Sequence, residues 1–137
     1  MLERITHRAF FGDANYPFAL SDGMLAELEQ ITGKGASAVY VQLANLTYTA
    51  ATLREIIRLG LIGAGMSPKE AKRLVEAYAV NTPLGELFPL AFEILSVRWD
   101  GTGEKATAAE KDKPAERSWV QELADASGAD RFAEARA

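Results

Sequence analysis

The clearest local signal in the sequence is Gly63-Ala64-Gly65-Met66-Ser67-Pro68-Lys69-Glu70, in which one helix has to end and another has to begin. The two closely spaced glycines disfavour continuation of a helix. Ser67 supplies an N-cap oxygen, Pro68 takes the first helical position, where no N–H donor is needed, and Glu70 completes a capping-box pattern. The stretch therefore predicts two successive helices joined by a short turn.

Apolar residues recur at helical spacing on both sides of this turn. Upstream, the spacing predicts helices over residues 21–33, 36–46 and 50–61, with Ser21 or Asp22 and then Thr49 as caps and Gly33 as a C-terminal stop. The apolar residues of these three helices, and of the helix that begins at Pro68, are expected to face the core. They are Met24, Leu25, Leu28 and Ile31 in the first, Val39, Tyr40, Leu43 and Leu46 in the second, Leu53, Ile56, Ile57 and Leu61 in the third, and Ala71, Leu74, Val75 and Tyr78 in the fourth. Thr82-Pro83 repeats the cap-plus-proline device for a fifth helix. Because that helix is apolar on nearly all sides, we expect it at the centre of the packing.

The first twenty residues predict a β-hairpin. Two aromatic stretches, Ala9-Phe10-Phe11 and Tyr16-Pro17-Phe18-Ala19-Leu20, flank Gly12-Asp13-Ala14-Asn15, whose residue types favour a turn. Pro17 cannot donate to a strand ladder, so its strand should lie at an edge. The fold class is therefore α+β, mainly α: an N-terminal hairpin packed on about five short helices, followed by a flexible C-terminal tail.

The chain divides near residue 102 into two compositions. Residues 1–102 hold 38 of the 42 large apolar side chains, whereas residues 103–137 hold four apolar side chains, 14 charges and ten alanines. So little apolar area cannot offset the chain entropy lost on folding. We expect a compact domain over 1–102 and a charged, Ala-rich, flexible tail over 103–137. A short helix near 117–125 would place Trp119, Val120 and Leu123 on one side, where they can dock on a partner or on the body.

Composition excludes most kinds of chemistry. The chain has no cysteine and a single histidine, so no disulfide, thiolate metal site or cysteine nucleophile is available, and His7 is expected on a strand surface. No apolar run is long enough to span a bilayer, and the first eight residues have no signal-like apolar core. We therefore predict a cytoplasmic protein that is not an enzyme, with no catalytic, cofactor-binding or metal site and no membrane contact.

A DNA-binding regulator is the more remote alternative. Lys69, Lys72 and Arg73 lie on one side of the helix that follows the glycine turn, as in a helix-turn-helix. Glu70 and Glu76 interrupt this basic face, and the chain carries a net charge of −4. Because DNA binding requires a positive face, we expect no nucleic-acid partner.

The body resembles the small tail proteins of gene transfer agents and of related siphophage-type prophages. The resemblance covers about residues 8–97, and its most specific parts are Leu25-Ala26-Glu27-Leu28-Glu29 and the helix end Gly60-Leu61-Ile62-Gly63-Ala64-Gly65. Proteins of this family are described as phage tail tube proteins of the gene-transfer-agent type and are grouped with tail assembly chaperones. The resemblance implies a non-enzymatic role in tail assembly, with tape-measure or tail tube protein as partner and a cytoplasmic or virion-associated location.

The resemblance leaves two roles open: a tail assembly chaperone that is absent from the finished particle, and a structural minor tail or tube component. A tube subunit needs enough strands to close a ring of sheet, and one hairpin with five helices offers few, so we favour the chaperone. The expected contact residues are the hairpin aromatics Phe10, Phe11 and Tyr16 and the tail residues Trp119 and Leu123. Phe10 and Phe11 point to opposite faces of a strand, so one of them should be core and the other available. The sequence leaves open which one is exposed, and it does not fix the oligomeric state.

Overall fold

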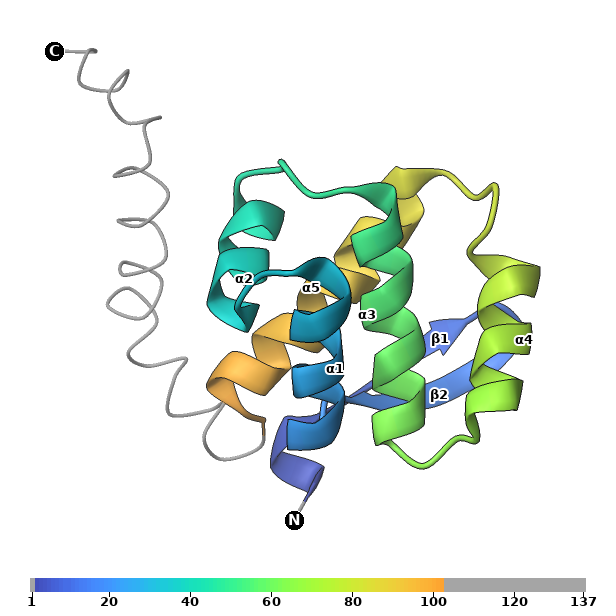
Figure 1. Cartoon of the computed structure of the whole chain (residues 1–137). Coiled ribbons are helices and arrows are strands. Elements are labelled where there is room, and N and C mark those ends of the chain that lie inside the picture. Colours follow the sequence, from blue (N-terminus) through green and yellow to red (C-terminus); the bar gives the residue numbers. More distant parts are fainter. Residues whose placement is uncertain (1, 103–137) are drawn as a thin grey trace, which may run out of the picture.

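The computed structural model describes residues 2–102, which form an antiparallel hairpin followed by five α-helices (Figure 1). A 3-10 helix, η1 (Leu2–Ile5), precedes the strands β1 (Thr6–Phe11) and β2 (Ala14–Ala19). The helices are α1 (Asp22–Thr32), α2 (Ala36–Ala44), α3 (Ala50–Gly63), α4 (Pro68–Tyr78) and α5 (Leu84–Asp100). The predicted mainly α, α+β fold is confirmed. The expectations for residues 103–137, including the helix near 117–125, lie outside the described residues.

The hairpin turn is tighter than the sequence predicts. The strands pair from Thr6 opposite Ala19 to Phe11 opposite Ala14, which leaves a turn of only Gly12 and Asp13. Gly12 has a φ of +72°, a conformation that side-chain-bearing residues rarely adopt. The ring of Tyr78 also packs directly on Gly12, where a Cβ atom would collide with it. Gly12 therefore serves both the turn and the contact between the hairpin and α4.

Local caps fix the starts of α1, α3 and α4 as predicted, but the predicted cap at Thr82 is wrong. The N-cap residue of α5 is Pro83, and the Thr82 hydroxyl donates back to the carbonyl oxygen of Tyr78 instead. The side-chain oxygens of Ser21, Thr49 and Ser67 accept hydrogen bonds from the backbone of α1, α3 and α4, and Gly33 ends α1 with a φ of +73°. The Ser67 hydroxyl lies 3.2 Å from the backbone nitrogen of Glu70, as a capping box requires. The Glu70 carboxylate, however, binds Arg73 one turn further along the same helix. Only the serine part of the predicted capping box is therefore present.

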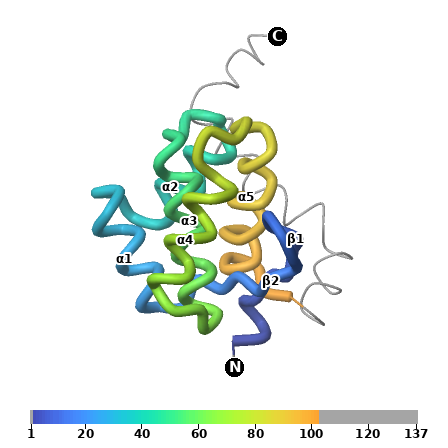
Figure 2. Tube along the Cα trace, turned by 90° about the vertical axis from the view of Figure 1, so that its right-hand side faces the viewer, coloured from blue at the N-terminus to red at the C-terminus, as the bar shows by residue number. Residues whose placement is uncertain are grey.

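Helix α3, and not α5, lies at the centre of the packing. It contacts β2, α1, α4 and α5, and Figure 1 shows it between α1 and α2 on one side and α4 on the other. Seven residues of α3 are buried, against four of α5: Thr52, Leu53, Ile56, Ile57, Leu59, Gly60 and Leu61 in α3, and Leu87, Ala91, Ile94 and Leu95 in α5. Figure 2 shows the hairpin on one outer side of α5, with α1 on the far side of the molecule. The expected central position of the fifth helix is therefore wrong.

A close approach between backbones holds β2 on α3. A Cβ atom on Gly63 would overlap the carbonyl oxygen of Ala19, the last residue of β2, and would lie 3.2 Å from the Cγ atom of Met24. The sequence predicts Gly63 only as part of a helix end. In the structure Gly63 is the last residue of α3, and its missing side chain is what lets the strand touch the helix.

Three residues predicted to face inward are exposed. Helix α2 ends at Ala44, so Leu46 falls in the following connection with a φ of +60° and is 67% exposed. Ile31 is exposed in the last full turn of α1. Tyr78 is 37% exposed, although its ring meets that of Phe11 edge-on with centroids 6.1 Å apart. Helical periodicity assigned these residues correctly to helices or their ends but not to the core.

An aromatic row joins α2 and its following connection to α5. Five rings stack in the order Trp99, Tyr40, Phe92, Phe88 and Tyr48, with centroids 4.7 to 5.7 Å apart. Tyr40 is buried within this row, and its burial raises the pKa of its hydroxyl.

In residues 2–102 no helix is both long and apolar enough to cross a membrane.

Candidate interaction surface

The two faces of the hairpin have different environments, because successive strand residues point in opposite directions. The inner face packs on the helices and carries the core residues Phe11 and Phe18, whose rings meet edge-on with centroids 6.2 Å apart. The outer face carries three directly opposed pairs: Thr6 with Ala19, whose Ala19 is buried, and then Arg8 with Pro17 and Phe10 with Asn15. In the last two pairs, Arg8, Phe10 and Asn15 are exposed and Pro17 is half-buried. The outer face is thus open to a partner.

This outer face continues onto η1 and forms the hairpin patch, which we define as Leu2, Arg8, Phe10, Asn15 and Pro17. A shallow hollow on the patch is lined by Leu2, Glu3, Thr6, Arg8, Pro17 and Ala64. Phe10 is 65% exposed and Leu2 is 40% exposed, so the patch presents two large apolar side chains to solvent. Apolar side chains gathered on one surface of a small protein are typical of a protein–protein contact.

The hairpin patch carries the positive charge of Arg8, and the hollow on the patch is also lined by Glu3. Arg8 is exposed, and among residues 2–102 it forms no ion pair. Arg4, two residues after Leu2 in η1, is exposed as well. An unpaired guanidinium next to an exposed phenyl ring favours a partner surface with carboxylate and apolar groups.

The predicted contact residues of the hairpin differ in exposure. Phe10 is exposed on the hairpin patch, whereas Phe11 is only 5% exposed and belongs to the core. The prediction that one of the two is core is confirmed, and Phe11 is therefore excluded as a contact residue. Tyr16 is half-buried on the inner face, toward α4. Trp119 and Leu123 lie outside the described residues.

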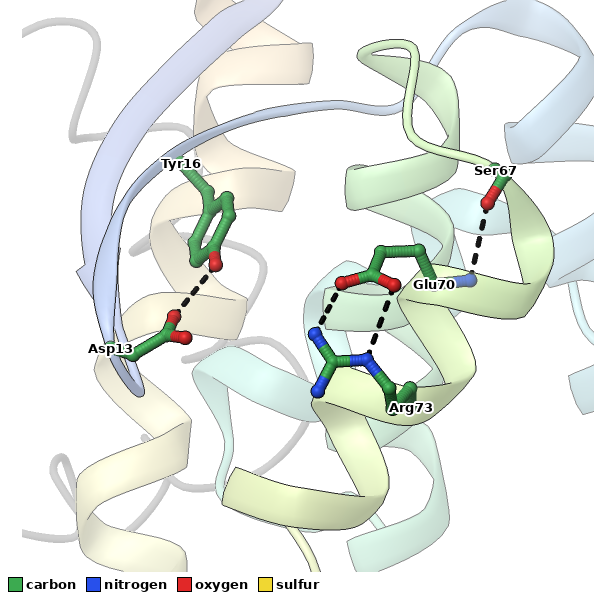
Figure 3. A network of polar contacts seen from close by, with 5 residues as sticks. All are labelled: Asp13, Tyr16, Ser67, Glu70 and Arg73. Carbon is green, nitrogen blue, oxygen red and sulfur yellow. Dashed lines mark hydrogen bonds and ion pairs between the residues drawn. The ribbon is translucent and has the colours of Figure 1, made fainter.

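Tyr16 belongs to a polar cluster between the hairpin and α4 (Figure 3). Its hydroxyl donates to the Asp13 carboxylate at 2.6 Å, and Figure 3 shows the Glu70–Arg73 pair facing it from α4. The hydrogen bond to Asp13 raises the pKa of Tyr16, and the Arg73 guanidinium lowers the pKa of Glu70. The Tyr16–Asp13 hydrogen bond lies within the hairpin and the Glu70–Arg73 ion pair lies within α4, and the two pairs face each other across the contact between these elements.

The Asp13→Asn variant is expected to lower the pKa of Tyr16 toward its ordinary value of 10.0, because a neutral amide stabilises the protonated hydroxyl less than a carboxylate does. Since folding raises this pKa, the hydrogen bond adds stability below pH 10, and the contribution disappears as pH rises through the folded pKa. NMR titration of the Tyr16 ring measures the change. Asp22→Asn is the control, because Asp22 is exposed at the start of α1 and pairs with Arg98, and it should leave the pKa of Tyr16 unchanged. An unaltered Tyr16 pKa in Asp13→Asn would refute the assigned cause.

The basic residues of α4 are largely neutralised by their own helix. Lys72 Nζ lies 2.7 Å from the Glu76 carboxylate, and the Arg73 guanidinium forms a bidentate ion pair with the Glu70 carboxylate. Lys69 is exposed. The face that sequence spacing offered to DNA thus presents alternating charges rather than a continuous positive surface.

Sequence reasoning missed most of the hairpin patch. Arg8 could have been assigned to the face of Phe10 from strand alternation alone. Leu2 and Ala64 come from η1 and from the end of α3, and their place beside the hairpin depends on tertiary packing. His7 lies on β1, opposite Phe18, and is half-buried. In the described part of the chain, no three acidic or histidine side chains form a group that could hold a metal ion.

Comparison with known protein families gives a match over most of the chain. Residues 4–101 match the family described as phage tail tube protein, GTA-gp10. This range begins in η1 and ends just after α5, so it spans all the helices and strands whose packing is described above. No curated protein and no solved structure matches the chain.

Proposed function

The chain belongs to the GTA-gp10 family of phage tail tube proteins, and we propose that it is a tail assembly chaperone that binds tape-measure or tail tube protein through the hairpin patch. The family is one of phage tail proteins and not a family of enzymes, so its members act within or on the phage tail. The family match shows the family, and we propose in addition the chaperone role, the partner and the contact surface.

The single observation that carries the proposal is the exposed phenyl ring of Phe10 beside the unpaired Arg8 on the outer face of the hairpin. Aromatic and arginine side chains supply most of the binding energy in protein–protein contacts. The two strands also have no further neighbour among residues 2–102, so an extended segment of a partner could pair with a free edge. A surface of this modest size favours reversible binding, which a chaperone needs.

A structural tail component is the second candidate, and the description of the matched family as a tail tube protein favours it. A tube subunit has to contribute sheet to a closed ring. Within residues 2–102 the sheet has two strands, and one of its faces is covered by helices. This geometry supports the chaperone over the tube subunit.

Co-expression with the tape-measure protein or the tail tube protein tests the proposal. The wild-type chain should raise the soluble fraction of at least one of these proteins, and Phe10→Ser should remove most of that gain, because it deletes the exposed ring. Leu46→Ser is the matched control, since Leu46 is 67% exposed but lies in the α2–α3 connection. The control should retain the full gain.

Two outcomes would contradict the proposal. If the wild-type chain leaves both tail proteins as insoluble as they are alone, the chaperone role is wrong. If Phe10→Ser and Leu46→Ser solubilise the tail proteins as well as wild type, the role stands but the hairpin patch is not the contact surface.

A further inference from the structure

We propose that residues 116–125 of the chain itself cover the hairpin patch until a tail protein displaces them. This regulatory contact rests on the proposed function of the patch, but the contact within the chain can be tested in the absence of any partner. The segment is Glu116-Arg117-Ser118-Trp119-Val120-Gln121-Glu122-Leu123-Ala124-Asp125.

The described chain ends beside the patch. The hydroxyl of Thr102, two residues after α5, donates to the backbone oxygen of Glu3 at 2.8 Å. Glu3 lines the hollow together with Leu2, Arg8 and Pro17. Residues 103–115 form the connection, and a connection of this length can span about 40 Å when extended, which is ample to bring residue 116 onto a surface that begins next to residue 102.

The segment is complementary in charge to Arg8, while the Glu3 carboxylate lines the same hollow from η1. The segment contains Glu116, Glu122 and Asp125 against the single base Arg117, so its net charge is −2. The patch presents the guanidinium of Arg8, which has no ion-pair partner within residues 2–102. The acidic side chains of the segment would supply that partner.

The two surfaces are also complementary in apolar character. Trp119, Val120 and Leu123 are three of the four large apolar residues in the last 35 residues of the chain. The patch exposes Phe10 and Leu2 beside the ring of Pro17. Burying an indole ring against these side chains removes apolar area from water on both sides at once.

The covalent link makes even a weak contact effective. Short tethers give an effective concentration of about 1 mM, so a contact with a dissociation constant of about 0.1 mM would be roughly nine-tenths occupied. A tail protein then has to displace the segment, and deleting the segment would strengthen partner binding by about tenfold. The contact would thus keep Phe10 covered in chains that have no partner.

A spin label tests the contact in the full chain without a partner. Because the chain has no cysteine, Ser118→Cys provides a unique position for a nitroxide. We expect the label to broaden the backbone amide signals of Arg8, Phe10 and Asn15 selectively, while amides of Tyr48 and Phe88 keep their intensity. Arg8→Glu should restore the broadened signals, and Arg8→Glu combined with Glu122→Lys should broaden them again.

A label further along the chain distinguishes this contact from random encounters of the tail with the body. A nitroxide on Ala137→Cys should leave the patch signals sharper than the label at residue 118 does. The inference is overturned if the label at residue 118 affects no amide, broadens all amides equally, broadens Tyr48 and Phe88 instead, or has an effect that Arg8→Glu leaves intact. A chain that passes this test but fails to solubilise tail proteins would refute the proposed function alone.

Discussion

The Gly63→Ala variant is expected to lose about 3 kcal/mol of unfolding free energy, because a single methyl group would overlap the backbone oxygen of Ala19. A flexible side chain could move aside, but this obstacle is main chain at the end of β2. Relief requires that the hairpin shift away from α3, which would also loosen the packing of Phe18 on Gly60, where a Cβ atom would already lie 3.2 Å from the Phe18 Cβ atom.

Urea unfolding followed by far-ultraviolet circular dichroism measures this loss. Gly23→Ala is the matched control, because a Cβ atom at Gly23 meets nothing within 4 Å and Gly23 lies in the first turn of α1. The control should be neutral or stabilised by about 0.5 kcal/mol through the better helix propensity of alanine. Equal stability of the two variants would show that β2 does not contact α3 as described.

The Phe18→Ala variant is expected to be destabilised by about 3–5 kcal/mol, the second large effect. Phe18 is completely buried between the hairpin and the helices, and its ring meets Phe11 edge-on. Truncation removes the transfer free energy of a phenyl ring and leaves a cavity that the surrounding helices cannot fully close. The loss would consume a large part of the stability of a domain of this size.

Phe10→Ala is the matched control in the same hairpin. Phe10 is the same residue type, but it is 65% exposed on the outer face, so its truncation should change the unfolding free energy by no more than about 0.5 kcal/mol. The same urea titration compares the two variants. A loss at Phe10 as large as the loss at Phe18 would mean that the outer face is also packed and that the hairpin patch is not available to a partner.

Local signals in the sequence were sufficient to place most helix and strand boundaries. Ser21, Thr49 and Ser67 cap their helices in the structure because an N-cap depends on residues within one turn. The role of Gly63 could not be predicted in the same way. Its local environment indicates a helix end, whereas its function depends on Ala19, which is 44 positions away in the chain.

The central helix was misassigned for a physical reason. Apolar residues on all sides of α5 indicate burial, yet several of them form the half-exposed aromatic row with α2 or face solvent, as Leu84 does. Helix α3 has a clearer polar side, but it packs on three other helices and on β2, whereas α5 packs on two other helices and otherwise on β1, β2 and η1. Contacts between elements, and not the hydrophobicity of one element, decide which helix is central.

The candidate surface was predicted only in part. Strand alternation showed that one of Phe10 and Phe11 would be exposed, but the choice depends on which face the helices cover. The partnership of Leu2 with Arg8 and Pro17 arises from η1 folding back beside the hairpin. The proposal that Trp119 and Leu123 cover the hairpin patch is argued from their residue types and from the position of Thr102 beside the patch.

The composition of purified particles tests the chaperone assignment most directly. Mass spectrometry should find the chain in lysates of producing cells, bound to tape-measure or tail tube protein, and should find none of it in finished tails. A chain present in finished tails at a copy number similar to that of the tail tube subunit would contradict the assignment and establish the structural role instead.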